Sequence, residues 1–322
     1  MISVNRQAAA IVEEMIAQAE TLGIRVSRLP GGARLLDLGL QVPGGLQAGK
    51  YLAEVCMGGL GQVTFLPLLF GDFWLPGLGV TVDQPAIGCM ASQYAGWAIK
   101  RDKFFAMGSG PARALAVVEK LYEKLEYKDS AEVAILVLEG RQLPTEEVAG
   151  YIADKCVVSP ANLTMLIAPT ASLAGSIQIS ARVVETGLHK LVELGFDVRQ
   201  VLSGYGTAPI APVDKDDLHA IGRTNDCVLY GGQVYYTVRA DDAELAALVE
   251  RIPSSASSDY GQPFYRLFKQ YGDFYKIDPL LFSPAQVIIN NVASGKSYRA
   301  GRLNAQVLGA SLLGLEGGRP AA

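Results

Sequence analysis

The sequence predicts a mixed α/β protein of the α+β type, with two domains per subunit. At 322 residues the chain is longer than one hydrophobic core usually serves. Half of its residues are hydrophobic and 19% are charged, which is typical of a globular protein. Helical and strand-like stretches alternate, but without the regular βαβ repeat of a doubly wound sheet. We place one domain at residues 1–165 and the other at 166–322, and each can be discontinuous in sequence.

The first half of the chain contains a helix over about residues 5–22, which Asn5 caps. "IRVSRL" and "ARLLDLGL" are two strands joined by a turn at "PGG". "LQAGKYLAEVCMGG" is a helix or a strand, and "QPAIGCMASQYAGWAI" a strand with or without a turn. "GPARALAVVEKLYEKLEY" is a helix with Pro111 at its first position and Ser109 near its cap.

Two buried strands follow, "EVAILVLEG" and "LTMLIAPT", with the helix "TEEVAGYIADKC" between them. "DVRQVLSGYGTAPIAP" runs from a strand into a loop, and "DCVLYGGQVYYTVRA" is a hairpin that turns at Gly231–Gly232. Beyond it we expect a helix, the aromatic loop "YGQPFYRLFKQYGDFYKID", and a helix or strand at "AQVIIN". The end, "LEGGRPAA", is expected to fray.

The stretch "GSIQISARVVETGLHKLVELG", residues 175–195, has the periodicity of one amphipathic helix. Ser176 serves as the N-cap and Gly195 as the terminator. Its apolar positions are spaced four, three, four and three apart, at Ile177, Ala181, Val184, Leu188 and Leu191. This spacing predicts a face that packs against the protein core.

A polar stripe runs beside that apolar face, at Gln178, Arg182, Glu185 and His189. Arg182 and Glu185 are three residues apart, so their side chains meet on the helix surface. Such a pair is often only a solvated salt bridge. The preceding "APTASLAGS" consists of small and hydroxyl residues ahead of a helix start, an arrangement that favours a ligand.

Charge and composition exclude several classes of function. The chain has 28 Lys+Arg against 32 Asp+Glu and no basic run, so we expect no nucleic-acid partner. The most apolar run, "FLPLLFGDFWLPGLGV", is too broken by Pro, Gly and Asp to span a membrane; it is a lining loop or an oligomer contact. The chain has two His, and its four cysteines, Cys56, Cys89, Cys156 and Cys227, lie far apart. We therefore expect no metal site and four buried thiols in a reducing cytosol.

Four short motifs need separate interpretation. "SGKS" at 294–297 lacks the first Gly of a phosphate-binding loop, and "GGLG" at 58–61 is only part of a dinucleotide motif. "AMGSGPAR" places Ser109, Gly110 and Arg113 at a helix start, which is either an anion site or a plain helix cap. "RTND" at 223–226 is a turn, either one that contacts a heterocycle or an ordinary Asx turn.

Taken together, seven motifs resemble one family across nearly the whole chain. They are "EVCMGGLG", "PAIGCMASQYAGW", "FFAMGSGPARAL", "APTASLAGSIQISARVVET", "GYGTAPIAP", "GRTNDCVLYGG" and "YGQPFY". In this order they resemble methenyltetrahydromethanopterin cyclohydrolase, a one-carbon enzyme of methanogens and methylotrophic bacteria. One departure is Gln84, because "DHPAI" is common in the family where this chain has "DQPAI".

The resemblance implies reversible hydrolysis of 5,10-methenyl-tetrahydromethanopterin to the N5-formyl form. It also implies a pterin substrate, no cofactor and no metal. The subunit would be part of a cytoplasmic homo-oligomer, a trimer by that resemblance, with the substrate in a cleft between two domains. The family's catalytic pair falls on Arg182 and Glu185 here. Substrate contacts are expected at further residues of the shared motifs: Ser92, Gln93, Ser109, Gly110, Arg113, Gln178 and Asn225.

The chemistry agrees with this pair. The methenyl carbon lies between two nitrogens of a cationic amidine, so it is electrophilic without a Lewis acid. One carboxylate, Glu185, can act as base and then as acid, and Arg182 can orient it or stabilise the attacking oxygen. Three alternatives stay open: a related pterin or folate cyclohydrolase, a non-catalytic pterin-binding protein, and a structural oligomer whose polar stripe is a salt-bridge lattice.

Overall fold

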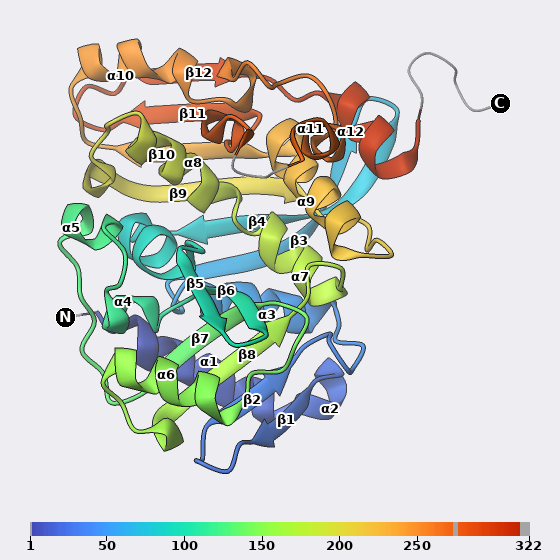
Figure 1. Ribbon diagram of the computed structural model, residues 1–322. Helices are drawn as coiled ribbons and strands as arrows, with labels where there is room; N and C mark the ends of the chain where they lie inside the picture. Colours follow the sequence, from blue (N-terminus) through green and yellow to red (C-terminus); the bar gives the residue numbers. More distant parts are fainter. Residues whose placement is uncertain (1, 273–275, 316–322) are drawn as a thin grey trace. The chain divides into compact units, whose positions relative to one another are not determined.

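The computed structural model describes residues 2–272 and 276–315 (Figure 1). The chain forms two compact units. Unit 1 consists of the residues up to Val63 together with Val82–Gln178, and unit 2 of Thr64–Thr81 together with the residues from Ile179 onward. Both units contain helices and a six-stranded mixed sheet, which confirms the mixed α/β class. The division into domains at residues 1–165 and 166–322 stays a prediction.

Unit 1 is built on a sheet with strand order β1-β2-β8-β7-β6-β5. Strands β2, β8 and β7 are parallel, whereas β1, β6 and β5 pair antiparallel with their neighbours. The strands are β1 Arg25–Arg28, β2 Arg34–Asp37, β5 Trp97–Arg101, β6 Phe104–Ser109, β7 Ala134–Glu139 and β8 Leu163–Ala168. The helices are α1 Val4–Ala17, α2 Ala19–Leu22, α3 Leu46–Cys56, the π-helix η1 Ala86–Gln93, α4 Arg113–Ala116, α5 Leu121–Leu125 and α6 Glu146–Cys156.

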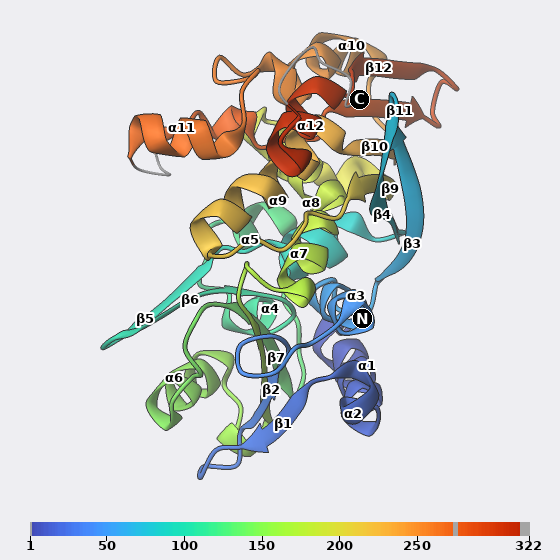
Figure 2. The ribbon, with the colours of Figure 1, turned by 90° about the vertical axis from the view of Figure 1, so that its right-hand side faces the viewer.

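Helices cover both faces of the unit 1 sheet, with α1 and α3 on one face and α6 on the other (Figure 2). The buried strands therefore carry apolar side chains on both faces. In β8, Met165 and Ile167 pack toward α6, whereas Leu166 and Ala168 pack toward α1 and α3. This explains why "LTMLIAPT" and "EVAILVLEG" are continuous apolar runs, and both strand predictions are confirmed.

Unit 2 is built on a second sheet, with order β12-β11-β10-β9-β4-β3. Strands β10 and β11 are parallel, and β9 and β12 pair antiparallel with them. The strands are β3 Gly61–Phe70, β4 Phe73–Val82, β9 Val201–Pro209, β10 Gln233–Val238, β11 Gln286–Asn291 and β12 Ser297–Gly301. The helices are α8 Val183–Glu193, α9 Asp217–Gly231, α10 Asp242–Leu248, α11 Phe264–Tyr271 and α12 Ala305–Leu313; α7, Leu173–Ser180, contains the passage from unit 1 to unit 2. Figure 2 shows α8, α9 and α12 on one side of this sheet.

Several element predictions for unit 1 are wrong in an instructive way. The first helix begins earlier than predicted, with Ser3 as its N-cap, and it ends at Ala17. Asn5 is not the cap, because its buried side chain donates to Asp129 and to the Pro111 carbonyl. The segment "QPAIGCMASQ" is the π-helix η1 and not a strand. The predicted long helix after Pro111 is two short ones, because Val117 adopts a left-handed conformation that ends α4 after four residues.

In unit 2, the predicted hairpin at Gly231–Gly232 is the end of α9 followed by β10. Cys227, Val228 and Leu229 are all buried in that helix, and a short apolar run of this kind does not distinguish helix from strand. "RTND" consequently lies inside α9 and is not a turn. The aromatic loop contains helix α11, and part of it lies at 273–275, outside the described residues.

The remaining predictions have simpler outcomes. "AQVIIN" is strand β11, "LQAGKYLAEVCMGG" is helix α3, and "SGKS" is the turn between β11 and β12. All four cysteines are buried thiols, as expected. Over residues 2–272 and 276–315, every helix is too short or too polar to cross a membrane. Nearly all of "LEGGRPAA" lies outside the described residues.

Candidate active site

The predicted catalytic pair stands at a break between two helices. The single helix expected over residues 175–195 is wrong: α7 ends at Ser180 and α8 begins at Val183. Arg182 is the N-cap of α8, and its backbone N–H donates to the Ile179 carbonyl over three residues instead of four. Glu185 is the third residue of α8, in the first turn, where acidic side chains stabilise a helix.

The two side chains meet on one turn of unit 2, as their spacing of three residues predicts. Arg182 Nη1 lies 3.8 Å from Glu185 Oε2. This is an ion-pair distance, but it is too long for a hydrogen bond. Both groups are largely shielded from solvent, with side-chain exposures of 11% and 7%. At such exposure the interaction between the charges is stronger than in a solvated surface pair.

The sheet of unit 2 fixes helix α8 through glycine and tyrosine. A Cβ at Gly204 of β9 would lie 2.7 Å from Val184 Cγ1, so only glycine allows α8 to approach this strand so closely. From the next strand, Tyr236 Oη donates a buried 2.7 Å hydrogen bond to the Val184 carbonyl. The motif "GYGTAPIAP" thus has a structural role, because it holds the helix that carries Arg182 and Glu185.

In unit 1, several predicted contact residues meet around the C-terminal end of the π-helix η1. Ser92 Oγ donates to the Cys56 carbonyl at 2.7 Å, and the Ser92 carbonyl accepts the Gly110 N–H at 2.8 Å. Gly110 has φ +93°, a conformation that favours glycine. Ser109 Oγ lies 3.6 Å from Cys56 Sγ. Ser92, Ser109 and Gly110 are therefore neighbours, and π-helical segments are frequent at functional sites.

Arg113 lies beneath this segment and is fully buried. Its guanidinium pairs with Glu119 through two hydrogen bonds, of which Nε–Oε1 is 2.8 Å. Its Nη1 also donates to the carbonyls of Ser92, at 2.8 Å, and Met90, at 3.3 Å. The expected accessible helix N-terminus is absent here, because α4 is a single short turn. Arg113 thus supports the η1 backbone from inside, and a direct contact to substrate stays a prediction.

The other predicted contact residues have different surroundings. Gln93 is fully buried at the end of η1. Gln178 is buried in α7, and its Nε2 lies 3.5 Å from Glu139 Oε2. Asn225 is partly buried in the middle of α9, where its Nδ2 donates 2.8 Å to the Ile221 carbonyl of the same helix.

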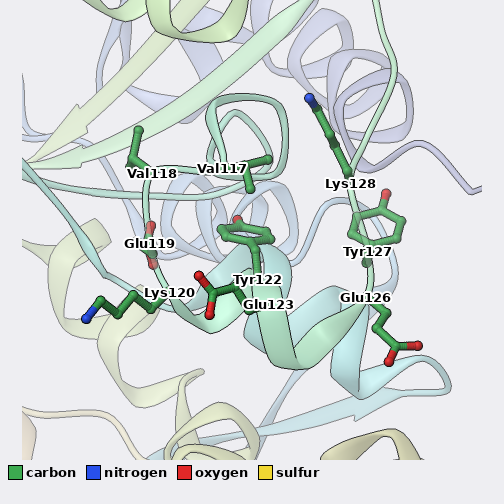
Figure 3. Close-up of a pocket in the computed structure, with 9 residues that line it drawn as sticks. All are labelled: Val117, Val118, Glu119, Lys120, Tyr122, Glu123, Glu126, Tyr127 and Lys128. Atoms are coloured by element: carbon green, nitrogen blue, oxygen red, sulfur yellow. The ribbon is translucent and has the colours of Figure 1, made fainter.

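A surface cavity of about 430 Å³ in unit 1 is lined by a single segment, residues 117–128 (Figure 3). None of the predicted site residues lines it. Glu119, which belongs to its wall, already binds Arg113. We therefore assign no part of the reaction to this cavity.

Sequence reasoning missed three residues that shape these places. Glu119 neutralises the buried Arg113, Tyr236 holds α8, and Glu139 accepts hydrogen bonds from Thr170 and Gln178. A signal existed for Glu139, since it is a carboxylate that ends an apolar strand. No signal existed for Tyr236, because its partner Val184 is distant in sequence. None existed for Glu119, because it meets Arg113 only after the chain turns at Val117. Among the described residues, no group of three or more His, Cys, Asp and Glu side chains is arranged to hold a metal ion.

A mixed α/β protein that holds a shielded glutamate beside an arginine on one helical turn presents a carboxylate that can accept and return a proton. Comparison with known proteins specifies the family. A sequence model described as cyclohydrolase (MCH) matches residues 3–312. The chain belongs to this cyclohydrolase family.

Several curated relatives bear the name methenyltetrahydromethanopterin cyclohydrolase. The protein of Methanocaldococcus jannaschii is 49% identical over 318 residues, which cover 97% of this chain and 98% of the relative. That of Methanococcoides burtonii is 47% identical, with coverages of 96% and 97%. The bacterial protein of Methylobacillus flagellatus is 46% identical, with coverages of 95% and 94%. The similarity therefore extends over nearly the whole of each chain.

Proposed function

We propose that this chain catalyses the reversible hydrolysis of 5,10-methenyl-tetrahydromethanopterin to N5-formyl-tetrahydromethanopterin. The supporting observation is full-length identity of 46–49% to relatives that carry the name of this cyclohydrolase. The shielded Arg182–Glu185 pair supplies the acid–base group that the chemistry requires. The reaction would serve one-carbon metabolism in methanogenesis or methylotrophy.

In the first step, Glu185 accepts a proton from water as the water oxygen attacks the methenyl carbon. The positive charge of the amidine is neutralised, and a tetrahedral adduct with a hydroxyl group forms. Arg182 stands beside the carboxylate and donates to the oxygen on which negative charge develops. The substrate carries its own electrophilic charge, so this step needs no Lewis acid.

In the second step, the bond between the former methenyl carbon and N10 breaks. Glu185 returns its proton to N10, and the adduct hydroxyl loses its proton as the formyl C=O forms. The balance is one water consumed and one proton released in the hydrolytic direction. Substrate contacts are proposed at the motif residues Ser92, Gln93, Ser109, Gly110, Arg113, Gln178 and Asn225.

The decisive experiment is a spectrophotometric turnover assay with methenyl-tetrahydromethanopterin and with methenyl-tetrahydrofolate. We expect turnover of the first and much slower turnover of the second. Preference for the folate would indicate a related folate cyclohydrolase. Stoichiometric binding without turnover would indicate a pterin carrier. If substitution of Glu185 changed only assembly, the salt-bridge lattice would be the better interpretation.

The mechanism is proposed to need no metal and no cofactor other than the pterin substrate. Treatment with EDTA should then leave turnover unchanged, measured before and after dialysis. Loss of activity that a divalent ion restores would overturn this part of the proposal. The control is a parallel sample that is dialysed without chelator.

A cytoplasmic homo-oligomer, a trimer by family resemblance, is also part of the proposal. Tyr205 of β9 and Tyr235 of β10 are direct cross-strand partners. Their neighbours Gly204 and Tyr236 face α8. Because side chains alternate along a strand, Tyr205 and Tyr235 lie on the opposite face of the sheet. Both are exposed, and Leu69 and Trp74 of β3 and β4 are 74% and 66% exposed. Exposed apolar side chains of this kind support contact with another subunit. Light scattering should give three times the 34.3 kDa chain mass, and the chain mass alone would contradict it.

A further inference from the structure

A polar cluster outside the catalytic pair joins two strands and a helix of unit 1. Glu139 is the last residue of β7, and Thr170 follows the end of β8 by two residues. Thr170 Oγ1 donates a hydrogen bond to Glu139 Oε1, and Gln178 Nε2 lies 3.5 Å from Oε2. Thr170 and Gln178 are buried, whereas Glu139 keeps part of its surface exposed. The cluster therefore presents a carboxylate from a fixed polar base.

Its place in the sheet is one where ligands bind. Strands β2, β8 and β7 are parallel, and Glu139 is in register with Ala168, so their carboxyl ends share one edge. In open α/β sheets, ligands bind outside the carboxyl ends of the strands. Asp37, the last residue of β2, is the other carboxylate at this edge, but its oxygens accept the N–H groups of residues 39–41 and build a turn. Glu139 has no such local role.

Among the described residues, Glu139 has no cationic partner. In the part of the chain that the structure describes, it forms no ion pair with Lys, Arg or His; its contacts are the hydroxyl of Thr170 and the amide of Gln178. A carboxylate offers about four acceptor positions on its two oxygens, and here each oxygen has a single donor. A partly buried carboxylate without a cation is costly unless additional donors bind it. Each oxygen thus has room for one more N–H donor.

We propose that Glu139 binds the 2-amino-4-oxopyrimidine edge of the pterin substrate. That edge carries N3–H and the 2-amino group side by side, and the two N–H donors match the two oxygens of a carboxylate. Thr170 and Gln178 hold the carboxylate in the orientation that this bidentate contact requires. This inference rests on the proposed function for the identity of the substrate, and it makes Glu139 a residue for binding and specificity, separate from the proton transfer at Glu185.

The variant Glu139→Gln tests the contact, because it keeps the size of the side chain and can still accept from Thr170. In the glutamine side chain, an NH₂ group replaces one of the two carboxylate oxygens. This donor would face an N–H donor of the pterin, so one of the two hydrogen bonds is lost. We expect KM for methenyl-tetrahydromethanopterin to rise about tenfold to a hundredfold, with kcat changed less than about threefold. Thr170→Val, which removes only the supporting hydroxyl, should raise KM by a smaller factor. The control is Glu132→Gln, an exposed carboxylate of the same unit that pairs with Arg6; it should leave both constants unchanged.

A binding measurement separates this inference from the proposed function. The fluorescence of 6-methylpterin and of 6-methyllumazine, which lacks the 2-amino group, reports binding without catalysis. Wild type should prefer the pterin by about tenfold, and Glu139→Gln should lose that preference. If wild type lacks cyclohydrolase turnover but shows this preference, the proposed function fails and the inference stands. An unchanged KM and an unchanged preference in Glu139→Gln, with or without a lower thermal midpoint, would show that Glu139 only links β7 to α7 and would overturn it.

Discussion

Arg182 Nη1 lies 3.8 Å from Glu185 Oε2, so the two side chains form an ion pair that no direct hydrogen bond holds. Their proximity comes from the backbone. Arg182 is the N-cap of α8, Glu185 is its third residue, and Tyr236 and Gly204 fix the helix against the sheet. Because the backbone places both residues on one turn of a fixed helix, we expect a substitution of either side chain to leave α8 in place.

Glu185→Gln should lower kcat by about 10²–10⁴, because the amide cannot accept the proton of the attacking water. The fold should persist, because glutamine keeps the size of the side chain and much of its hydrogen bonding, and the 3.8 Å ion pair with Arg182 has no direct hydrogen bond to lose. The control is Glu193→Gln, at the end of the same helix and partly exposed beside His189, which should leave kcat unchanged. Steady-state kinetics with circular dichroism of each variant measures both effects.

Arg182→Ala should also be slow, and the double variant should lose far less than the product of the two single losses, because the pair acts as one unit. Additive losses would show that the two residues act independently. Near-normal turnover of Glu185→Gln would place the base elsewhere and leave Glu185 as a structural partner of Arg182.

The contact between Arg182 and Glu185 and the strands β1, β2, β7, β8 and β9 were predictable from sequence, because they depend on local spacing. The apolar run at residues 65–80, for which a lining loop or an oligomer contact was expected, instead forms most of strands β3 and β4. The apolar positions Ile177, Ala181, Val184 and Leu188 are all buried, as the periodicity predicted. The same periodicity hid the break at Ala181–Arg182, since the spacing continues across it. A break that changes one backbone hydrogen bond, Arg182 N–H to the Ile179 carbonyl, leaves no mark on the pattern of apolar residues.

Long-range polar contacts were not predictable. The helix expected after Pro111 fails because Arg113 pairs with Glu119, six residues on, and that pairing requires the chain to turn back at Val117. A left-handed Val is locally unfavourable, so only tertiary contacts explain it. Glu139 and Thr170 likewise meet only because β7 and β8 are neighbours in the sheet.

The main effect of Arg113→Ala should be a loss of stability, with a rise in KM as a secondary effect. The guanidinium is fully buried, and its removal leaves the largely buried Glu119 without a partner, at a cost of about 3–5 kcal/mol in unfolding free energy. Urea denaturation measures this loss. Arg113→Met combined with Glu119→Met should be closer to wild type, because no charge stays buried. A stable Arg113→Ala with a raised KM would instead support the anion contact expected from sequence.

Gly204→Ala tests the support of α8. The new Cβ would lie 2.7 Å from Val184 Cγ1, so α8 must shift, at about 1–3 kcal/mol in stability and with a several-fold lower kcat. The matched control is Gly150→Ala in α6, where a Cβ meets nothing within 4 Å. That variant should be neutral or stabilising by up to about 1 kcal/mol, because alanine favours the helix. Equal effects of the two variants would contradict the close packing of α8 on β9.

Asp226 should make the stability of the protein depend on pH. Its side chain is fully buried in α9, where it accepts the Phe264 N–H at 2.9 Å and the hydroxyl of Ser311. Burial disfavours the charged form and raises the pKa of Asp226 to about 7, although these two hydrogen bonds oppose the shift. The folded protein therefore binds this proton more tightly than the unfolded chain, whose aspartate titrates near pH 4.

It follows that the contribution of Asp226 to stability is fully present below about pH 4 and is lost as pH rises toward 7. Asp226→Asn stays neutral at every pH and can keep both hydrogen bonds. The unfolding free energy of variant and wild type is measured by urea denaturation at pH 5 and at pH 8. The difference, variant minus wild type, should be about 2–3 kcal/mol larger at pH 8 than at pH 5. Parallel profiles for the two proteins would mean that Asp226 is ionised in the folded state throughout, held by Ser311 and the Phe264 N–H despite its burial.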